Sequence, residues 1–246
     1  MIILNNINKL GESCLWNKYD EKFYWVDIID KKIKSYDGNN FKEFSTEKMP
    51  CCITLIDQHK FNLALEDSIG VYDIRNNSYN KQVSLLDNNV RFNDGKLNNN
   101  NVLHIGTMDR NEKEYIGKIY KYKNNYLEII KEDIGISNGI SFDSTNRMYY
   151  SDSLSGKLFY DNNMINQYND IGPDGACVDT NDNYYSCLWG GSRIDVYCNQ
   201  IVEQQIQLPV KYPTCCCYGG KDMNKLFITS ASIIDNSNNN GKIIII

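Results

Sequence analysis

The sequence is poor in histidine and proline, and it has no run of apolar residues as long as a membrane span. Only two histidines and four prolines occur in 246 residues. Neither histidine has an obvious catalytic partner and no G-x-S-x-G motif occurs, so a serine hydrolase is not indicated. The N-terminal stretch MIILNNINKLGES lacks the basic and long apolar regions of a secretory signal. We therefore expect a cytoplasmic protein with no membrane partner.

Basic patches and paired cysteine motifs are also missing. The net charge is −5 and the lysines are scattered, which leaves no electrostatic footprint for nucleic acid. The nine cysteines form no C-x-x-C motif, and neighbours such as Cys51 and Cys52 would point to opposite faces of a strand. We expect reduced thiols and no zinc ribbon. With 41% hydrophobic and 23% charged residues, the composition suits one soluble domain over residues 1–246, as a monomer or weak dimer.

A short aromatic or β-branched strand recurs at a spacing that averages about forty-one residues. Its six copies are FYWVD from Phe23, FNLAL from Phe61, LHIGT from Leu103, MYYSD from Met148, YYSCL from Tyr184 and LFITS from Leu226. A turn and a second strand of similar character follow most copies, as in GKIYKY from Gly117. Four-stranded units at this period are typical of a β-propeller, and six copies account for the whole chain.

The sequence therefore predicts an all-β fold, a six-bladed β-propeller with four-stranded blades. The last unit stops at GKIIII, its third strand, whereas MIIL precedes the first unit and has no place inside it. Because a ring must close and a free strand edge favours aggregation, the N-terminal strand is expected to complete the last blade. A β-sandwich and a pair of small β-domains are the alternative architectures.

Four of the six positions that lie ten or eleven residues before the repeated strand carry a side-chain oxygen. The six positions are Glu12, Pro50, Asn93, Asn138, Asp174 and Cys215. Singly, the N-D-G, S-N-G and P-D-G sequences among them are ordinary turn signals. Turns do not explain the shared register, which would place these side chains in one ring around the axis of the propeller.

Carboxylates and amide oxygens that converge in a channel would be poorly solvated unless a cation joined them. The ring thus predicts one divalent cation with oxygen ligands, Ca²⁺ first and Mg²⁺ or Mn²⁺ as alternatives. Zn²⁺ is a weaker alternative, since neither His59 nor His104 falls in the ring. Both histidines are expected to be structural, His59 in a turn and His104 on a strand.

These strings, in this order, resemble the senescence marker protein/gluconolactonase family, also called the regucalcin-like family. The resemblance extends over nearly the whole chain, through LGES-x-x-W from Leu10, RFNDGK from Arg91, ISNG from Ile136, PDGACVD from Pro173 and LWGGSRI from Leu188. It implies a six-bladed propeller with a divalent-metal site and lactonase activity on sugar lactones. It also implies metal ligation by Glu12, Asn138 and Asp174, substrate contacts from Arg91 and Asn93, and a role for Asp174 as general base.

The chain departs from the family pattern in three places. GESP becomes GESC at Cys14, and the segment before PDG is short. The acidic residue that contacts substrate after GTM falls in DRNEKE, where register favours Glu112 over Asp109 and Glu114.

The resulting hypothesis is a metal-dependent lactonase in which the cation polarises the lactone carbonyl and Asp174 assists attack by water. The first alternative is a calcium-binding regulatory protein that lacks significant catalysis. The second alternative, a hydrolase of esters or phosphotriesters, would need a more apolar mouth than the Asn-rich loops predict. Residues 189–191 (Trp-Gly-Gly) and 215–217 (three cysteines) are interpreted as packing near the channel, outside the site.

Overall fold

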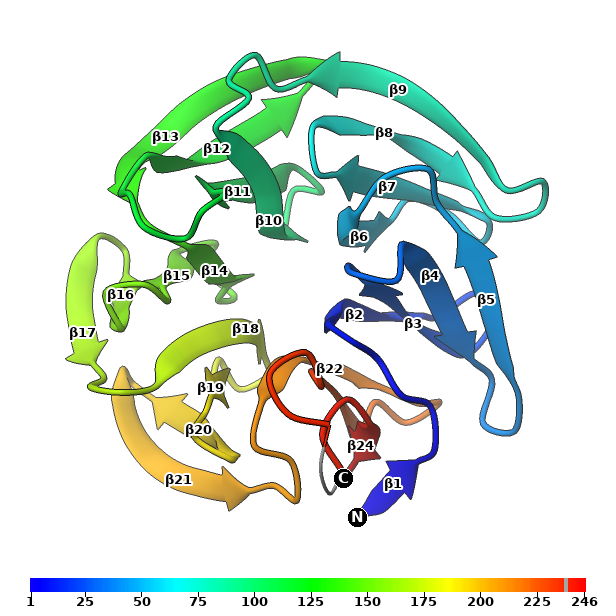
Figure 1. Ribbon diagram of the computed structural model, residues 1–246. Coiled ribbons are helices and arrows are strands. Elements are labelled where there is room, and N and C mark those ends of the chain that lie inside the picture. Colours follow the sequence, from blue (N-terminus) through cyan, green and yellow to red (C-terminus); the bar gives the residue numbers. More distant parts are fainter. Residues whose placement is uncertain (237–238) are drawn as a thin grey trace.

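The protein is a ring of six antiparallel blades around a central channel (Figure 1). It is described by a computed structural model over residues 1–236 and 239–246. The expected six-bladed propeller with four strands in every blade is confirmed. Within these described residues, no helix is long and apolar enough to span a membrane.

Five blades are formed by consecutive strands, numbered from the channel outward. The first blade contains β2 (Gly11–Asn17), β3 (Lys22–Asp27), β4 (Lys32–Tyr36) and β5 (Phe41–Ser45). The second contains β6 (Pro50–Leu55), β7 (Lys60–Leu65), β8 (Ser68–Asp73) and β9 (Ser78–Ser84). The third contains β10 (Val90–Leu97), β11 (Leu103–Asp109), β12 (Gly117–Lys123) and β13 (Tyr126–Ile134).

The fourth blade contains β14 (Ser137–Phe142), β15 (Met148–Asp152), β16 (Lys157–Tyr160) and β17 (Asn163–Gln167). The fifth contains β18 (Gly172–Val178), β19 (Tyr184–Trp189), β20 (Arg193–Cys198) and β21 (Ile201–Gln207). The repeated strand of the sequence is therefore the second strand of each blade. It is almost wholly buried because it packs between the neighbouring blades.

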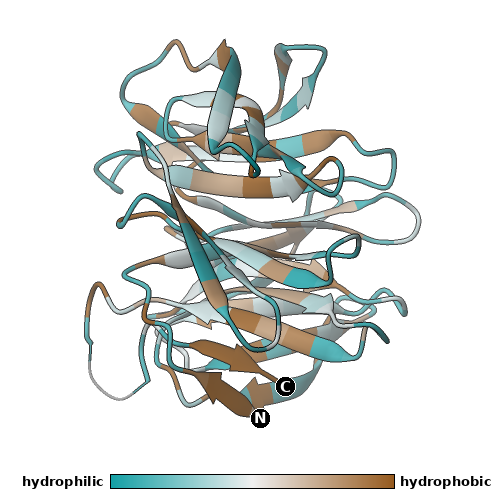
Figure 2. Cartoon of the chain, turned by 90° about the vertical axis from the view of Figure 1, so that its right-hand side faces the viewer, coloured by the Kyte–Doolittle hydropathy of each residue, from teal (hydrophilic) through white to brown (hydrophobic). Residues whose placement is uncertain are grey.

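The sixth blade joins the two ends of the chain. Its strands are β22 (Pro213–Gly219), β23 (Lys225–Ser230), β24 (Ile243–Ile245) and, outermost, β1 (Ile2–Leu4). Ile3 pairs with Ile244 in the antiparallel β1–β24 register, and Figure 2 shows these apolar end strands side by side. The prediction that the N-terminal strand completes the last blade is thus confirmed.

Aromatic contacts hold neighbouring blades together. Phe23 of blade one stacks on Phe227 of blade six at a centroid distance of 4.2 Å. Tyr149 of blade four stacks on Tyr184 of blade five at 4.4 Å. Fully buried Trp25 lies against Phe227 at 5.5 Å. Such rings bury large apolar areas, so the spacing of the aromatic strands in the sequence also fixes how the blades pack.

The cysteines contribute to this packing as thiols. All nine are free, and eight are buried. Cys177 of β18 and Cys216 of β22 are in contact, with their sulfur atoms 3.5 Å apart. Burial raises the pKa of the thiols of Cys51 to about 11 and of Cys187 to about 12. These thiols therefore stay protonated and behave as small apolar side chains.

Candidate active site

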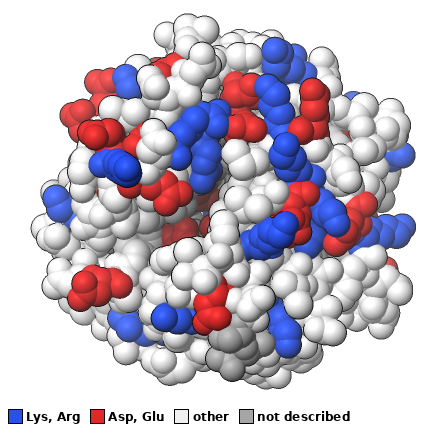
Figure 3. All heavy atoms as spheres, in the orientation of Figure 1, with Lys and Arg blue, Asp and Glu red and all other residues white. Residues whose placement is uncertain are grey.

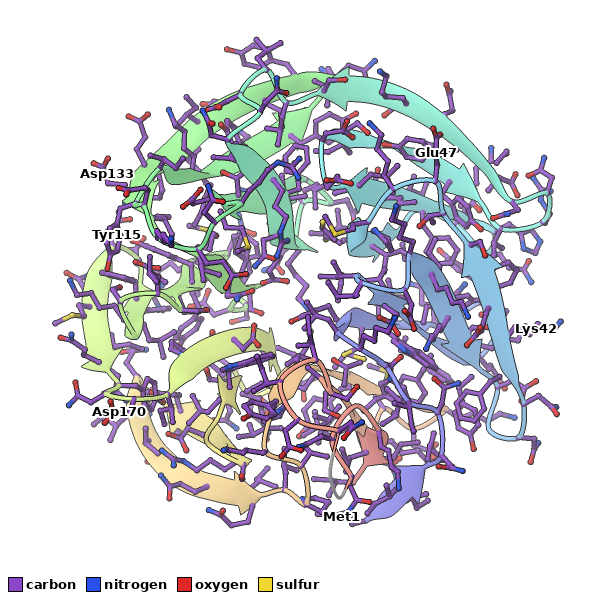
Figure 4. All side chains as sticks on the ribbon, viewed as in Figure 1. Met1, Lys42, Glu47, Tyr115, Asp133 and Asp170 are labelled. Carbon is purple, nitrogen blue, oxygen red and sulfur yellow. The ribbon has the colours of Figure 1, made fainter. Side chains whose placement is uncertain are left out.

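A cavity of about 610 Å³ opens at one end of the channel. Figure 3 shows it as a central hollow with acidic atoms at its floor and basic side chains on the side of β10–β13. Side chains from the inner strands converge on the channel (Figure 4). All six residues that the sequence predicts for the site line this cavity: Glu12, Arg91, Asn93, Glu112, Asn138 and Asp174.

A β-bulge interrupts the innermost strand of every blade, and in four blades it lies at Glu12, Asn93, Asn138 or Asp174. The pairing with the second strand slips after Glu12, Phe92, Asn138 and Pro173, and likewise in blades two and six. A bulge bends the strand and turns a side chain out of the regular alternation. The N-D-G, S-N-G and P-D-G sequences are therefore bulges inside strands, and not turns between them. Gly139, with φ at +62°, supplies the left-handed residue of one such bulge.

Glu12 and Asp174 form a buried carboxyl pair at the floor of the cavity. Their exposed fractions are 8% and 6%. Burial, and next the charge of Asp94, raise the pKa of Glu12 to about 8. Burial and then the charge of Glu12 raise the pKa of Asp174 well above its usual value. Without a cation, the pair holds a proton that carboxyl groups normally release far below neutral pH.

The neighbouring Asp94 has partners of its own. Its Oδ2 accepts the backbone N–H of Ile140 at 2.9 Å, and the positive charge of Lys96 lies close enough to favour its ionised form. Burial nevertheless raises the pKa of Asp94. The charge of Lys96 and several backbone N–H groups thus favour the ionised form of Asp94. Glu12 and Asp174 have fewer backbone donors.

The amide oxygen of Asn138 completes a set of oxygen atoms with the carboxyl pair. Asn138 Nδ2 donates to Ser153 Oγ at 2.9 Å, so its Oδ1 faces the cavity and accepts from Asn93 Nδ2 at 3.1 Å. Ser153 Oγ in turn donates to the carbonyl of Pro173 at 2.6 Å. These bonds fix the orientation of the amide and join blades three, four and five beneath the cavity.

Arg91 lies directly beside this set. Its Nη1 donates to Asn93 Oδ1 at 2.8 Å and to the carbonyl of Phe92 at 3.0 Å. Arg91 and Asn93 both line the cavity. Arg91 thus places a fixed positive charge next to the acidic floor.

Three acidic residues lie at the end of β11 and in the loop that follows it, and they have different surroundings. Glu112 lines the cavity, with a left-handed φ of +57°. Asp109 is only 2% exposed, and its carboxylate accepts the backbone N–H groups of Asn111, Lys113 and Glu114. These bonds lower the pKa of Asp109, which organises the loop and leaves Glu112 to face the cavity.

The donor set at the floor fits a hard cation. Among residues 1–236 and 239–246 there is no group of three histidine, cysteine, aspartate or glutamate side chains suited to a metal. The set here consists of two carboxyls and one amide, and the nearby charge of Arg91 does not offset the burial that raises the pKa of both carboxyls. Oxygen ligands of this kind suit Ca²⁺, Mg²⁺ or Mn²⁺. His59 lies in a turn and His104 on β11, both away from the floor, as expected.

Some residues that line the cavity were not predicted from the sequence. Trp189, expected to pack outside the site, lines the cavity together with Leu154 and Ile171. Polar Asn169 and Asp170 line the same side, so the mouth is of mixed polarity. The apolar residues come from strand ends and short loops, which show no periodic pattern that would identify them in the sequence.

The fold and site define a six-bladed propeller with a carboxyl–amide cluster at one mouth of its channel. Residues 10–232 match the model of the SMP-30/gluconolactonase/LRE-like region, and the chain belongs to this family. The putative sugar lactone lactonase YvrE of Bacillus subtilis is 28% identical, over 91% of this chain and 84% of that protein. Regucalcin of Danio rerio is also 28% identical, over 94% and 86%.

A solved structure supports the same architecture. The calcium-binding protein regucalcin from Agrobacterium tumefaciens superposes with a TM-score of 0.91. The match covers 98% of this chain and 90% of that one, at 20% sequence identity. At this identity the likeness shows the fold alone.

Proposed function

We propose that this protein is a divalent-metal-dependent lactonase that hydrolyses sugar lactones such as gluconolactone. The observation that carries the proposal is the meeting of two buried carboxyls with raised pKa, an oriented amide oxygen and a fixed arginine in one open cavity. The name of the Bacillus subtilis relative, a putative sugar lactone lactonase, supports the same chemistry.

Glu12, Asn138 and Asp174 would hold the cation, with Ca²⁺ favoured by the all-oxygen set. When bound, such an ion withdraws electron density from a carbonyl and stabilises negative charge on its oxygen. Ser153 keeps the Asn138 oxygen directed into the cavity through the 2.9 Å bond to Nδ2. The backbone N–H of Ser13 does the same for Glu12, at 3.0 Å from Oε2.

Asp174 is assigned the proton transfer. A cation would lower the pKa of a carboxylate that holds it, so Asp174 would be ionised in the loaded protein and could accept a proton through the carboxylate oxygen that is free of the ion. In the proposed reaction it accepts a proton from the attacking water and passes it to the ring oxygen, which leaves as an alcohol when the bond between the acyl carbon and the ring oxygen breaks. Arg91 and Asn93 would orient the lactone through its carbonyl and hydroxyl oxygens, with Glu112 at the rim.

The test is a pH-stat assay of acid release from a panel of aldonolactones, with EDTA and with metal added back. We expect turnover that EDTA abolishes and that Ca²⁺ or another divalent ion restores. The variant Asp174→Asn should lose turnover by at least about a hundredfold, in the range found for a lost general base. Exposed Asp222→Asn, on the turn before β23, is the matched control and should match the wild type. Absence of metal-dependent acid release on every lactone would refute the proposal.

A calcium-binding regulatory protein is the alternative function. It is favoured by the description of the Agrobacterium tumefaciens structure as a calcium-binding protein. An ion binder would need the carboxyl–amide floor but would not need Arg91. Two hydrogen bonds from Nη1 hold the guanidinium of Arg91 next to this floor. Tight Ca²⁺ binding without turnover, unaffected by Arg91→Ala, would favour this alternative.

A further inference from the structure

The cavity extends from the axis of the channel to the outer edge of blade four. Asn138 lines its inner end and lies on β14, the innermost strand of that blade. Gln167 lines its outer end and is the last residue of β17, the outermost strand. Because neighbouring strands lie about 4.8 Å apart, the three spacings from β14 to β17 span about 14 Å. Figure 4 shows Asp170, another lining residue, far from the axis at the connection between β17 and β18. We call the part lined by Gln167, Asn169, Asp170 and Trp189 the outer groove.

Short elements of blade four leave the outer groove open. Strands β16 and β17 have four and five residues, whereas β12 and β13 of blade three have seven and nine. The connection from β17 to β18 contains only residues 168–171. The backbone N–H of Tyr168 donates to the carbonyl of Gly156 at 2.8 Å, and a Cβ on Gly156 would collide with the Tyr168 carbonyl. This connection is therefore held against the turn before β16 and is too short to fold over the cavity.

Three polar side chains of the outer groove are available to a ligand. Gln167, Asn169 and Asp170 are exposed, and their side chains bond no other residue in the described ranges 1–236 and 239–246. By contrast, the hydroxyl of the neighbouring Tyr168 donates to Asp195 Oδ2 at 2.9 Å. An amide can both donate and accept, and a carboxylate accepts through two oxygens. The outer groove can thus bond several hydroxyl groups at once.

The same groove has an apolar surface beside these polar groups. Trp189 packs against Tyr212 at a centroid distance of 5.0 Å, is half-buried and lines the cavity with Ile171. A sugar ring presents C–H groups on its faces, which suit an indole, and hydroxyls at its edge, which suit amides and carboxylates. Among the described lining residues, Arg91 is the only lysine or arginine, and it lies on β10 of blade three. The lining of the outer groove therefore supplies no cation for a phosphate, and the charge of Asp170 would repel one.

We propose that the substrate is an aldonolactone that carries a second, neutral sugar, and that this sugar lies in the outer groove. The inference rests on the proposed function and adds a glycosyl group to the sugar lactone named there. The lactone ring lies at the floor beside Glu12 and Asp174. The second sugar lies on Trp189, with its hydroxyls bonded to Asn169 and Asp170, and its glycosidic bond stays intact.

The size of the cavity agrees with two sugar units. With carbon–carbon bonds of about 1.5 Å, one hexose lactone with its substituents is roughly 7 Å across, which is about half the length from β14 to β17. A volume of about 610 Å³ lies in the range of cavities that enclose drug-sized molecules. Gluconolactone alone would therefore leave the outer groove empty.

A comparison of substrates tests the proposal. The pH-stat assay, with Ca²⁺ and with spontaneous hydrolysis subtracted, compares glucono-1,5-lactone with cellobiono-, lactobiono- and melibiono-1,5-lactone. These lactones share the same ring and differ in the added sugar or its linkage. Two or three further hydrogen bonds should raise kcat/KM of at least one of them about ten- to a hundredfold above that of gluconolactone. Gluconolactone equal to or above all three would overturn the inference, and so would 6-phosphogluconolactone above all three.

A variant links this preference to the outer groove. Asp170→Gly removes the carboxylate without straining the backbone, since glycine readily adopts the φ of +64° found there. It should reduce the ratio of kcat/KM between the preferred glycosylated lactone and gluconolactone by about tenfold. Asp161→Gly is the matched control, exposed and at a φ of +45° in the turn between β16 and β17, outside the cavity lining, and should keep the wild-type ratio. An unchanged ratio in Asp170→Gly would overturn the assigned place of the second sugar.

Binding of non-hydrolysable analogues separates this inference from the proposed function. Calorimetry in saturating Ca²⁺ compares glucono-1,5-lactam with the 1,5-lactams of the same three disaccharides. Affinity at least about tenfold higher for one disaccharide lactam, and reduced in Asp170→Gly, supports the outer groove even if no lactone is hydrolysed. Disaccharide lactams that bind no more tightly than glucono-1,5-lactam overturn it even if gluconolactone is hydrolysed.

Discussion

Replacing Glu12 by glutamine should stabilise the metal-free protein at neutral pH. Burial, and next the charge of Asp94, raise the pKa of Glu12 from 4.5 to about 8 in the folded protein. The folded state then binds more protons than the unfolded state between these two pH values, so stability falls as the pH rises. The contribution is fully present below about pH 4.5 and is lost as the pH approaches 8. At about 1.4 kcal/mol per pKa unit, the loss at pH 7 is on the order of 3 kcal/mol.

Glu12→Gln removes this titration. In EDTA at pH 7 we expect the variant to exceed the wild type in unfolding free energy by on the order of 3 kcal/mol. For a chain of this size that corresponds to a rise in Tm of about 6–12 °C. At pH 4.5 the two proteins should unfold together. Guanidinium and thermal unfolding from pH 4.5 to 8 measure the difference, and Glu203→Gln, at an exposed position on β21, should behave as the wild type at every pH.

Saturating Ca²⁺ should reverse the order of stability. A cation that binds only the folded state stabilises it by mass action, and Glu12→Gln forfeits one of the charged ligands. The reasoning is refuted if wild type and Glu12→Gln unfold together in EDTA at pH 7. It is equally refuted if the advantage of the variant grows toward acidic pH.

Three other substitutions test separate parts of the account. Arg91→Lys loses the guanidinium that bonds Asn93, and kcat/KM on a lactone should fall by about ten- to a hundredfold in the pH-stat assay. Gly139→Ala places a methyl group against the hydroxyl of Tyr184 at a φ of +62°, and calorimetry should show Ca²⁺ affinity reduced at least about tenfold. Trp25→Ala empties a fully buried position and should lower the unfolding free energy by about 3–5 kcal/mol in guanidinium titrations. Wild-type behaviour in any of these assays would contradict the corresponding assignment.

The architecture could be predicted from the sequence because one repeated pattern indicates both where the strands lie and which side chains pack between the blades. The aromatic strand that begins at Phe23 recurs in each blade, and its alternating side chains fill the spaces between neighbouring blades. Ring closure followed from the unpaired third strand at GKIIII and the spare strand at MIIL. The first inference uses the alternation of side chains along a repeated strand, and the second uses the number of strands in each repeat.

Only part of the site could be predicted from the sequence. The common register located Glu12, Asn93, Asn138 and Asp174, but their tripeptides look like turns, and only the structure shows the bulges that aim them. The place of Leu154, Ile171 and Trp189 in the cavity lining could not be predicted, since these residues lie at strand ends with no shared spacing. Trp189 illustrates this, because its packing on Tyr212 explains its presence without revealing the cavity on its other side.

The central claim is that Glu12, Asn138 and Asp174 together hold one divalent cation. Isothermal calorimetry of Ca²⁺ with the metal-free wild type, Asp174→Asn and Asp222→Asn tests it most directly. We predict one ion per chain for the wild type and for Asp222→Asn, with uptake of the ion releasing protons from the carboxyl pair. Asp174→Asn should bind at least about a hundredfold more weakly. Equal Ca²⁺ affinity in Asp174→Asn and the wild type would contradict the account.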